Sequence, residues 1–158
     1  MQDHPDSARP SLYDTDFSAW CHAQARLLRE GRLDALDIQN IAEELEGMSR
    51  SDKRQIRSRL EVLIAHLLKW KYQPGRRSSG WRGTIAEQRR RIALVVEDSP
   101  SLAAYPAQTA IDAYRAARLL AARETGIDFT LFPDACPFAA DQILDDDFLP
   151  VEPDIAGN

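Results

Sequence analysis

The chain has 158 residues, of which 44% are hydrophobic and 28% are charged, and its formal net charge is −5. This length and composition predict one soluble globular domain with a single core. They exclude a membrane-spanning protein, because no run approaches the roughly 18 apolar residues that a span needs. The first 15 residues also lack the apolar centre of a signal peptide, so a cytoplasmic location without membrane contact is expected.

Charge is distributed unevenly along the sequence. Between Arg50 and Arg91 there are thirteen Lys and Arg residues against three acids, whereas the segment from Glu124 to Asn158 has nine acids and no Lys or Arg. A basic segment can contact phosphates, but an acidic tail on the same chain can neutralise it. We therefore expect the tail to pack on the basic middle, and nucleic-acid binding is a less favoured alternative.

The first half of the chain contains three segments with helical periodicity. One helix is predicted from near Asp14 to Gly31, a second from Asp37 to Met48, and a third over residues 51–72. Gly47 favours a break or kink between the second and third, with one continuous bent helix as the alternative. The apolar stripes expected to face the core are Phe17, Trp20, Cys21, Gln24, Leu27 and Leu28; Ile38, Ile41, Ala42, Leu45 and Met48; and Ile56, Leu60, Leu63, Ile64, Leu67 and Trp70.

The second half predicts two more helices and an irregular end. A fourth helix should begin at Thr84 or one turn earlier, because Thr84 and Glu87 have capping-box spacing. A fifth should run from Pro106 to Gly126, with inward-facing Ile111, Tyr114, Ala117 and Leu120. The acidic tail has room for one short helix between Cys136 and Leu144.

These segments predict an all-α fold of about five amphipathic helices in a compact bundle over residues 13–126. A flexible leader over residues 1–12 precedes the bundle. An acidic, irregular tail over residues 127–158, with one short helix and loose last residues, is expected to pack on it.

Five segments resemble the bacterial family catalogued as domain of unknown function 29: YDTDFSAW, DIQNIAEELEGMSRSDKR, RLEVLIAHLLKWKYQP, GWRGTIAEQRRRIALVVEDSPSL and CPFAADQILDDDF. The resemblance extends from about Tyr13 to Pro150 and implies a small all-helical domain in a bacterial cytoplasm. It implies no activity, so no catalytic residue can be transferred from it. The chain departs from the family pattern at Gly80 and Gly83, which leaves the start of the fourth helix open.

Arg59 and His66 lie two turns apart on one edge of the apolar stripe of the third predicted helix. Their spacing resembles that of the HEPN ribonucleases, in which His would act as acid or base and Arg would stabilise phosphate charge. The favoured alternative gives His66 a hydrogen bond to a neighbouring helix and Arg59 a salt bridge.

A polar network is also expected between the second and fourth predicted helices. Arg89 lies at the border of an apolar stripe, and an inward guanidinium needs an acceptor. Glu44 is the expected carboxylate, in a network with Gln88 and His66. The simplest role of such a network is to fix the register of the helices.

The basic middle offers a candidate anion-binding surface of Lys69, Lys71, Arg76, Arg77 and Arg82 beside Trp81. No metal site or cofactor is expected, because the sequence contains no HExxH or two-His helix motif. The leading hypothesis is a protein-interaction or self-associating module whose partner is an unknown protein or a second copy. Nucleic-acid binding and a HEPN-like ribonuclease remain alternatives, and an exposed apolar stripe would indicate a homodimer interface.

Overall fold

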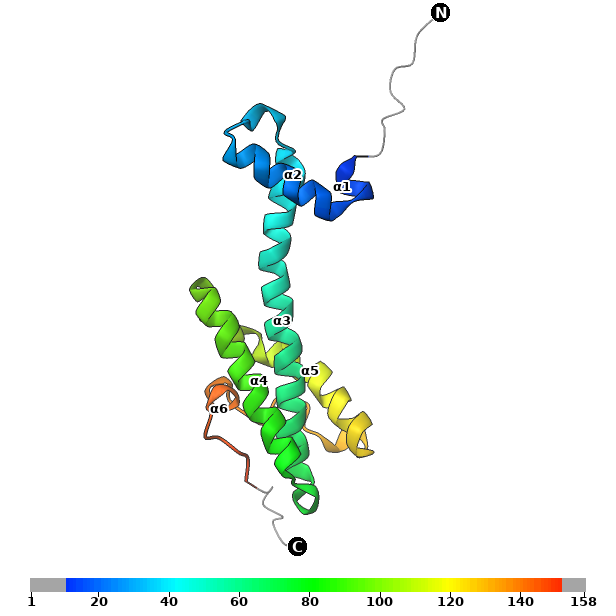
Figure 1. The fold of residues 1–158 in the computed structure, drawn as a ribbon. Helices are drawn as coiled ribbons and strands as arrows, with labels where there is room; N and C mark the ends of the chain where they lie inside the picture. Colours follow the sequence, from blue (N-terminus) through cyan, green and yellow to red (C-terminus); the bar gives the residue numbers. More distant parts are fainter. Residues whose placement is uncertain (1–10, 152–158) are drawn as a thin grey trace, which may run out of the picture. The chain divides into compact units, whose positions relative to one another are not determined.

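The computed structural model describes residues 11–151, and this part of the chain is all-α, which confirms the predicted fold class (Figure 1). The chain divides into two compact units, Met1–Ser49 and Arg50–Asn158. The boundary between the two units lies inside residues 13–126, the segment predicted to form a single bundle. The predicted leader, apart from its last two residues, and the last seven residues of the tail lie outside the described residues.

The first unit contains α1 (Leu12–Thr15), α2 (Phe17–Arg29), the short η1 turn (Leu33–Ala35) and the beginning of α3. Asp16 caps α2 by accepting a hydrogen bond from the backbone N–H of Ala19 at 2.9 Å. The predicted helix start at Asp14 is therefore wrong, because a separate turn of helix holds that residue. Gly31 ends α2 with a left-handed φ of 69°, as predicted.

Helix α3 (Ile38–Tyr72) is continuous, so the alternative of one helix is confirmed and the favoured break near Gly47 is wrong. A single glycine costs about 1 kcal/mol relative to alanine in a helix interior. That cost is small beside the intact backbone hydrogen bonds of 35 residues. The helix begins in the first unit and continues into the second.

The second unit contains the end of α3 together with α4 (Ser79–Asp98), α5 (Tyr105–Thr125) and α6 (Ala140–Leu144). Ser78 caps α4, and its side chain accepts from the backbone N–H of Trp81. Gly80 and Gly83 therefore both lie inside the first turns of α4. Short η2 (Pro74–Arg76), η3 (Pro100–Leu102) and η4 (Phe129–Leu131) turns join the longer elements.

The core of the second unit forms around α3, whose buried residues include Ile56, Leu60, Leu63, Ile64, Leu67 and Leu68. On α5 four of the eight buried residues are alanines, whereas Ile111 is 60% exposed. The prediction that Ile111 faces the core is wrong. The small side chains of Ala110 and Ala113 face the core instead. Phe132, Phe138 and Ile143 of the tail are buried in the same core.

Candidate functional site

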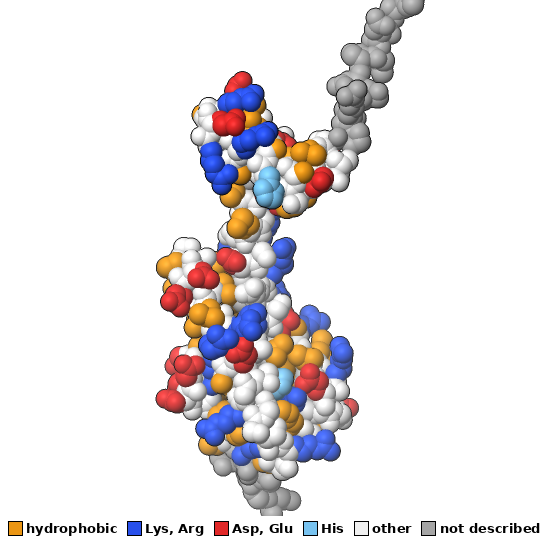
Figure 2. Space-filling view, in the orientation of Figure 1, with side chains coloured by type: hydrophobic (Ala, Val, Ile, Leu, Met, Phe, Trp, Pro, Cys, Tyr) orange, Lys and Arg blue, Asp and Glu red, His pale blue; other side chains and the backbone are white. Residues whose placement is uncertain are grey.

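The first unit exposes most of the apolar side chains that periodicity assigned to a core. Among its described residues only Trp20 is buried. At least half of the surface of each of six others is exposed: Phe17, Leu28, Leu33, Ile38, Leu45 and Met48. Five of these residues belong to the first two predicted stripes, and the prediction that they face a core is wrong: Phe17, Leu28, Ile38, Leu45 and Met48. In the view of Figure 2, apolar side chains of this unit lie at the surface among charged ones.

A shallow cavity of about 200 Å³ lies where α2 meets the first turns of α3. We call it the apolar groove, and its lining residues are Trp20, Cys21, Gln24, Ala25, Leu28, Ile41, Glu44 and Leu45. Phe17 extends the α2 side at helical spacing, and Ile38 and Met48 extend the α3 side. The exposed apolar residues of both helices therefore line or flank one groove.

Polar contacts hold the two sides of the groove in place. The indole N–H of Trp20 donates to Asp37 at 3.1 Å, and the backbone N–H of Asp37 donates to Gln24 at 2.9 Å. The hydroxyl of Tyr13 donates to Glu44 at 2.6 Å, and this hydrogen bond raises the pKa of Tyr13 to about 12. Hydrogen bonds involving Tyr13 of α1 and Trp20 and Gln24 of α2 thus join both helices to the beginning of α3.

Charged residues occupy exposed positions on both helices of the groove. Arg26, Arg29 and Arg32 are exposed on or just after α2. Glu43 and Glu46 are exposed on α3. Arg26 and Arg32 each lie 4.0 Å from Glu30, so the α2 side carries charges of both signs.

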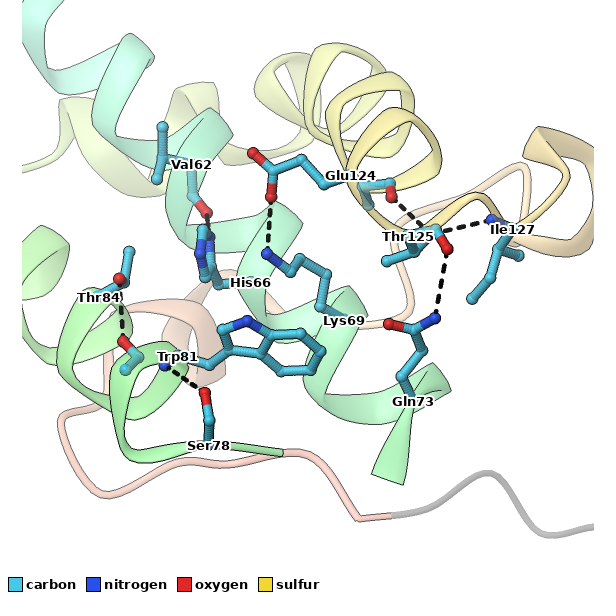
Figure 3. A network of polar contacts seen from close by, with 12 residues as sticks. Val62, His66, Lys69, Gln73, Ser78, Trp81, Thr84, Glu124, Thr125 and Ile127 are labelled. Carbon is cyan, nitrogen blue, oxygen red and sulfur yellow. Dashed lines mark hydrogen bonds and ion pairs between the residues drawn. The ribbon is translucent and has the colours of Figure 1, made fainter. Parts of the chain in front are cut away.

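In the second unit, Lys69 of the candidate anion-binding surface is buried between three helices (Figure 3). Its Nζ donates to Glu124 of α5 at 2.7 Å and lies 4.7 Å from the ring centroid of Trp81 on α4. The amide of Gln73 donates to the carbonyl of Thr125 one turn further along. Lys69 and Trp81 therefore join α3, α4 and α5, and Glu124 neutralises the positive charge.

The remaining cations of this surface differ in their surroundings. Arg77 donates from Nε to the carbonyl of Trp70 at 2.9 Å and lies over the Trp70 ring, while Lys71 lies 5.8 Å from the ring centroid of Phe138. Arg76 and Arg82 are exposed. Nucleic-acid binding by this surface stays a prediction.

The structure gives Arg59 and His66 different hydrogen-bond partners. Nη1 of Arg59 donates to Gln88 of α4 at 3.3 Å, and Nδ1 of His66 lies 2.9 Å from the carbonyl oxygen of Val62 on its own helix. Burial lowers the pKa of His66, nearby Lys69 lowers it further, and Glu124 partly opposes this. The ribonuclease hypothesis, which needs both side chains on one substrate, stays a prediction.

The lowered pKa of His66 predicts a pH dependence of stability. Because the unfolded histidine binds a proton more readily than the folded one, this group destabilises the fold as the pH falls through its ordinary value of 6.5. Between pH 7.5 and about pH 5.5, wild type should lose more unfolding free energy than His66→Gln. Urea denaturation at each pH measures the difference, and parallel losses in the two proteins would contradict it.

Arg89 is buried, as its position on the helix predicted, but Glu44 is not its partner. Its guanidinium donates to four backbone carbonyls of the tail, those of Ile143 and Phe148 at 2.9 Å, Gln142 at 3.3 Å and Asp146 at 3.4 Å. Burial lowers the pKa of Arg89, and Asp146 and Asp145 oppose the shift. Every residue has a backbone carbonyl, so the sequence does not show which carbonyls accept from Arg89, whereas a carboxylate is visible in it.

The predicted network of Glu44, Gln88, Arg89 and His66 is therefore replaced by separate contacts. Glu44 bonds to Tyr13 in the first unit, Gln88 to Arg59, Arg89 to the tail and His66 to Val62. The sequence did not identify the groove residues as a site. An apolar stripe has the same sequence pattern whether another part of the chain covers it or it is exposed.

Within residues 11–151, no helix combines the length and apolarity of a membrane span, and no three His, Cys, Asp or Glu side chains gather as metal ligands would. The family model described as Domain of unknown function DUF29 matches residues 12–149, which confirms the resemblance drawn from the motifs. No match was found among curated proteins or solved structures.

Proposed function

Since the chain belongs to the DUF29 family, whose description names no activity, we propose from its geometry that it is an interaction module that self-associates through the apolar groove. The observation that carries the proposal is the exposure of Leu28 and Leu45, at 51% and 63%, on the two walls of one groove.

The size of the first unit supports a partner for this surface. A helix pair of this length buries too little apolar area to form an independent core. Burying a fully exposed leucine or isoleucine side chain contributes about 1.5–3 kcal/mol, and Leu28, Ile38 and Leu45 have 51%, 65% and 63% of their surface left to cover. Several such side chains on one groove therefore supply a substantial driving force for association.

The pairing of two exposed apolar helix faces in one groove favours a second copy as the partner. In a two-fold symmetric pair the same surface meets itself, so α2 of one protomer can lie against the first turns of α3 of the other. The two helix pairs together make a four-helix bundle, a common way to cover such stripes.

The proposal keeps a bacterial cytoplasmic location and a self-associating or protein-binding role. It ranks nucleic-acid binding lower, because Lys69 is paired with Glu124 and Arg77 packs on Trp70.

Analytical ultracentrifugation tests the proposal over about 1–100 µM chain, a range that resolves micromolar dissociation constants. Wild type should form a dimer, and Leu28→Glu combined with Leu45→Glu should be monomeric, because four carboxylates would be buried at the interface. The matched control is Leu119→Glu, an exposed leucine of α5 at 49% exposure, which should leave the dimer intact. A monomeric wild type overturns the proposal, as does a dimer that survives the double substitution.

A further inference from the structure

A second cavity lies in the second unit between α5 and the segment from residue 129 to residue 136. Its volume is about 490 Å³, enough for a small organic molecule. Its wall combines apolar and charged groups, including Ile111, Tyr114, Arg118, Phe129, Asp134 and Cys136. None of these residues belongs to the apolar groove.

Arg118 is the buried charge of this cavity, with 8% of its surface exposed. Nη2 donates to the carbonyl of Phe132 at 2.7 Å, and Nη1 donates to Asp134 at 3.0 Å. The guanidinium also lies 3.9 Å from the ring centroid of Phe129, and its buried Nε has no hydrogen-bond partner. A guanidinium has five N–H donors, so these contacts leave it under-coordinated.

The carboxylate on Arg118 comes from a residue that is itself fully exposed. The side chain of Asp134 has 102% relative exposure, against 9% for that of Arg118. Water solvates an exposed carboxylate well, so Asp134 gains little from the ion pair. Asp134 can therefore leave Arg118 at low cost when another carboxylate arrives.

We propose that this cavity binds a small organic carboxylate with an apolar body. The carboxylate replaces that of Asp134 on the guanidinium of Arg118, where the planar fork of donors favours two parallel hydrogen bonds. The apolar body lies against Ile111, Tyr114 and Cys136. Exposed Arg115 lines the same cavity and adds a second positive charge.

The remaining wall groups suit an uncharged ligand body. The hydroxyl of Tyr114 donates to the carbonyl of Pro133, and burial raises the pKa of Tyr114 to about 12. Burial also raises the pKa of the Cys136 thiol. Both groups are therefore neutral at neutral pH and do not repel a carboxylate.

Calorimetric titration of the full chain with 4-phenylbutyrate tests the proposal, with the uncharged 4-phenylbutyramide as the matched probe. The acid should bind and the amide should bind at least about tenfold more weakly, because hydrogen bonds to charged groups are the stronger ones. Asp134→Asn should tighten binding of the acid about two- to fivefold by removing the competing carboxylate. Arg118→Gln should weaken it about tenfold or more.

Alkylation of the thiols locates the bound probe. The acid should slow modification of Cys136 and leave that of Cys21, in the first unit, unchanged. If Arg118→Gln does not fold, Asp134→Asn and the amide decide the question. Equal affinity for acid and amide, no binding by either wild type or Asp134→Asn, or no tightening in Asp134→Asn would each overturn the proposal.

Discussion

Replacing Arg89 with leucine is expected to lower the free energy of unfolding of the second unit by about 3–5 kcal/mol, since each buried carbonyl left without a donor costs about 1–3 kcal/mol. Arg89 is 4% exposed, and two of its hydrogen bonds to the tail, at Ile143 and Phe148, are 2.9 Å long. The substitution removes every donor that this side chain offers to the tail. Urea denaturation followed by tryptophan fluorescence measures the loss.

Two further substitutions separate the hydrogen bonds of Arg89 from its charge. Arg89→Lys keeps the charge but loses the planar fork of donors, so it should remain clearly less stable than wild type. The neighbouring Arg90 is exposed and pairs with Glu87 at 2.9 Å, so Arg90→Leu should cost no more than about 1 kcal/mol. An Arg89→Leu protein as stable as Arg90→Leu would show that the tail does not depend on this contact.

Arg89 also shows how far helical periodicity can predict a site. The phase of the helix placed its side chain at the edge of an apolar stripe, and the structure buries it. Its acceptors lie more than fifty residues further along the chain and belong to an irregular segment. Tertiary packing determines the path of such a segment. The sequence alone therefore does not show which of its carbonyls accept hydrogen bonds from Arg89.

The helix ends were more predictable than the packing partners, because their signals are local. Gly31 and Gly126 both have the left-handed φ that ends a helix, and both were predicted. Gly47 is also a glycine, but it lies inside α3, and the helix continues through this position. A glycine alone therefore does not separate an end from an interior position.

Periodicity likewise fails to show what covers an apolar stripe. The stripes of α2 and of residues 56–70 of α3 look alike in the sequence, yet Leu28 is 51% exposed and Leu60 is fully buried. On α5 the alanines, not the larger Ile111, face the core. The large side chains of a stripe thus mark either a core or an interaction surface.

Two alanine substitutions distinguish these roles within α3. Ile64 is fully buried, so Ile64→Ala should lower the free energy of unfolding by about 2–5 kcal/mol through the cavity that it leaves. Leu45 is 63% exposed, so Leu45→Ala should change it by less than about 0.5 kcal/mol when measured at a concentration where the chain is monomeric.

The effects of the two substitutions on self-association should be reversed. Leu45→Ala removes apolar area from the groove and should weaken dimerisation, about tenfold for a loss near 1.4 kcal/mol. Ile64→Ala should leave the dimer unchanged under conditions where the protein remains folded. If Leu45→Ala destabilised the monomer as much as Ile64→Ala, the groove residues would belong to a folded core, and the proposed interface would lose its basis.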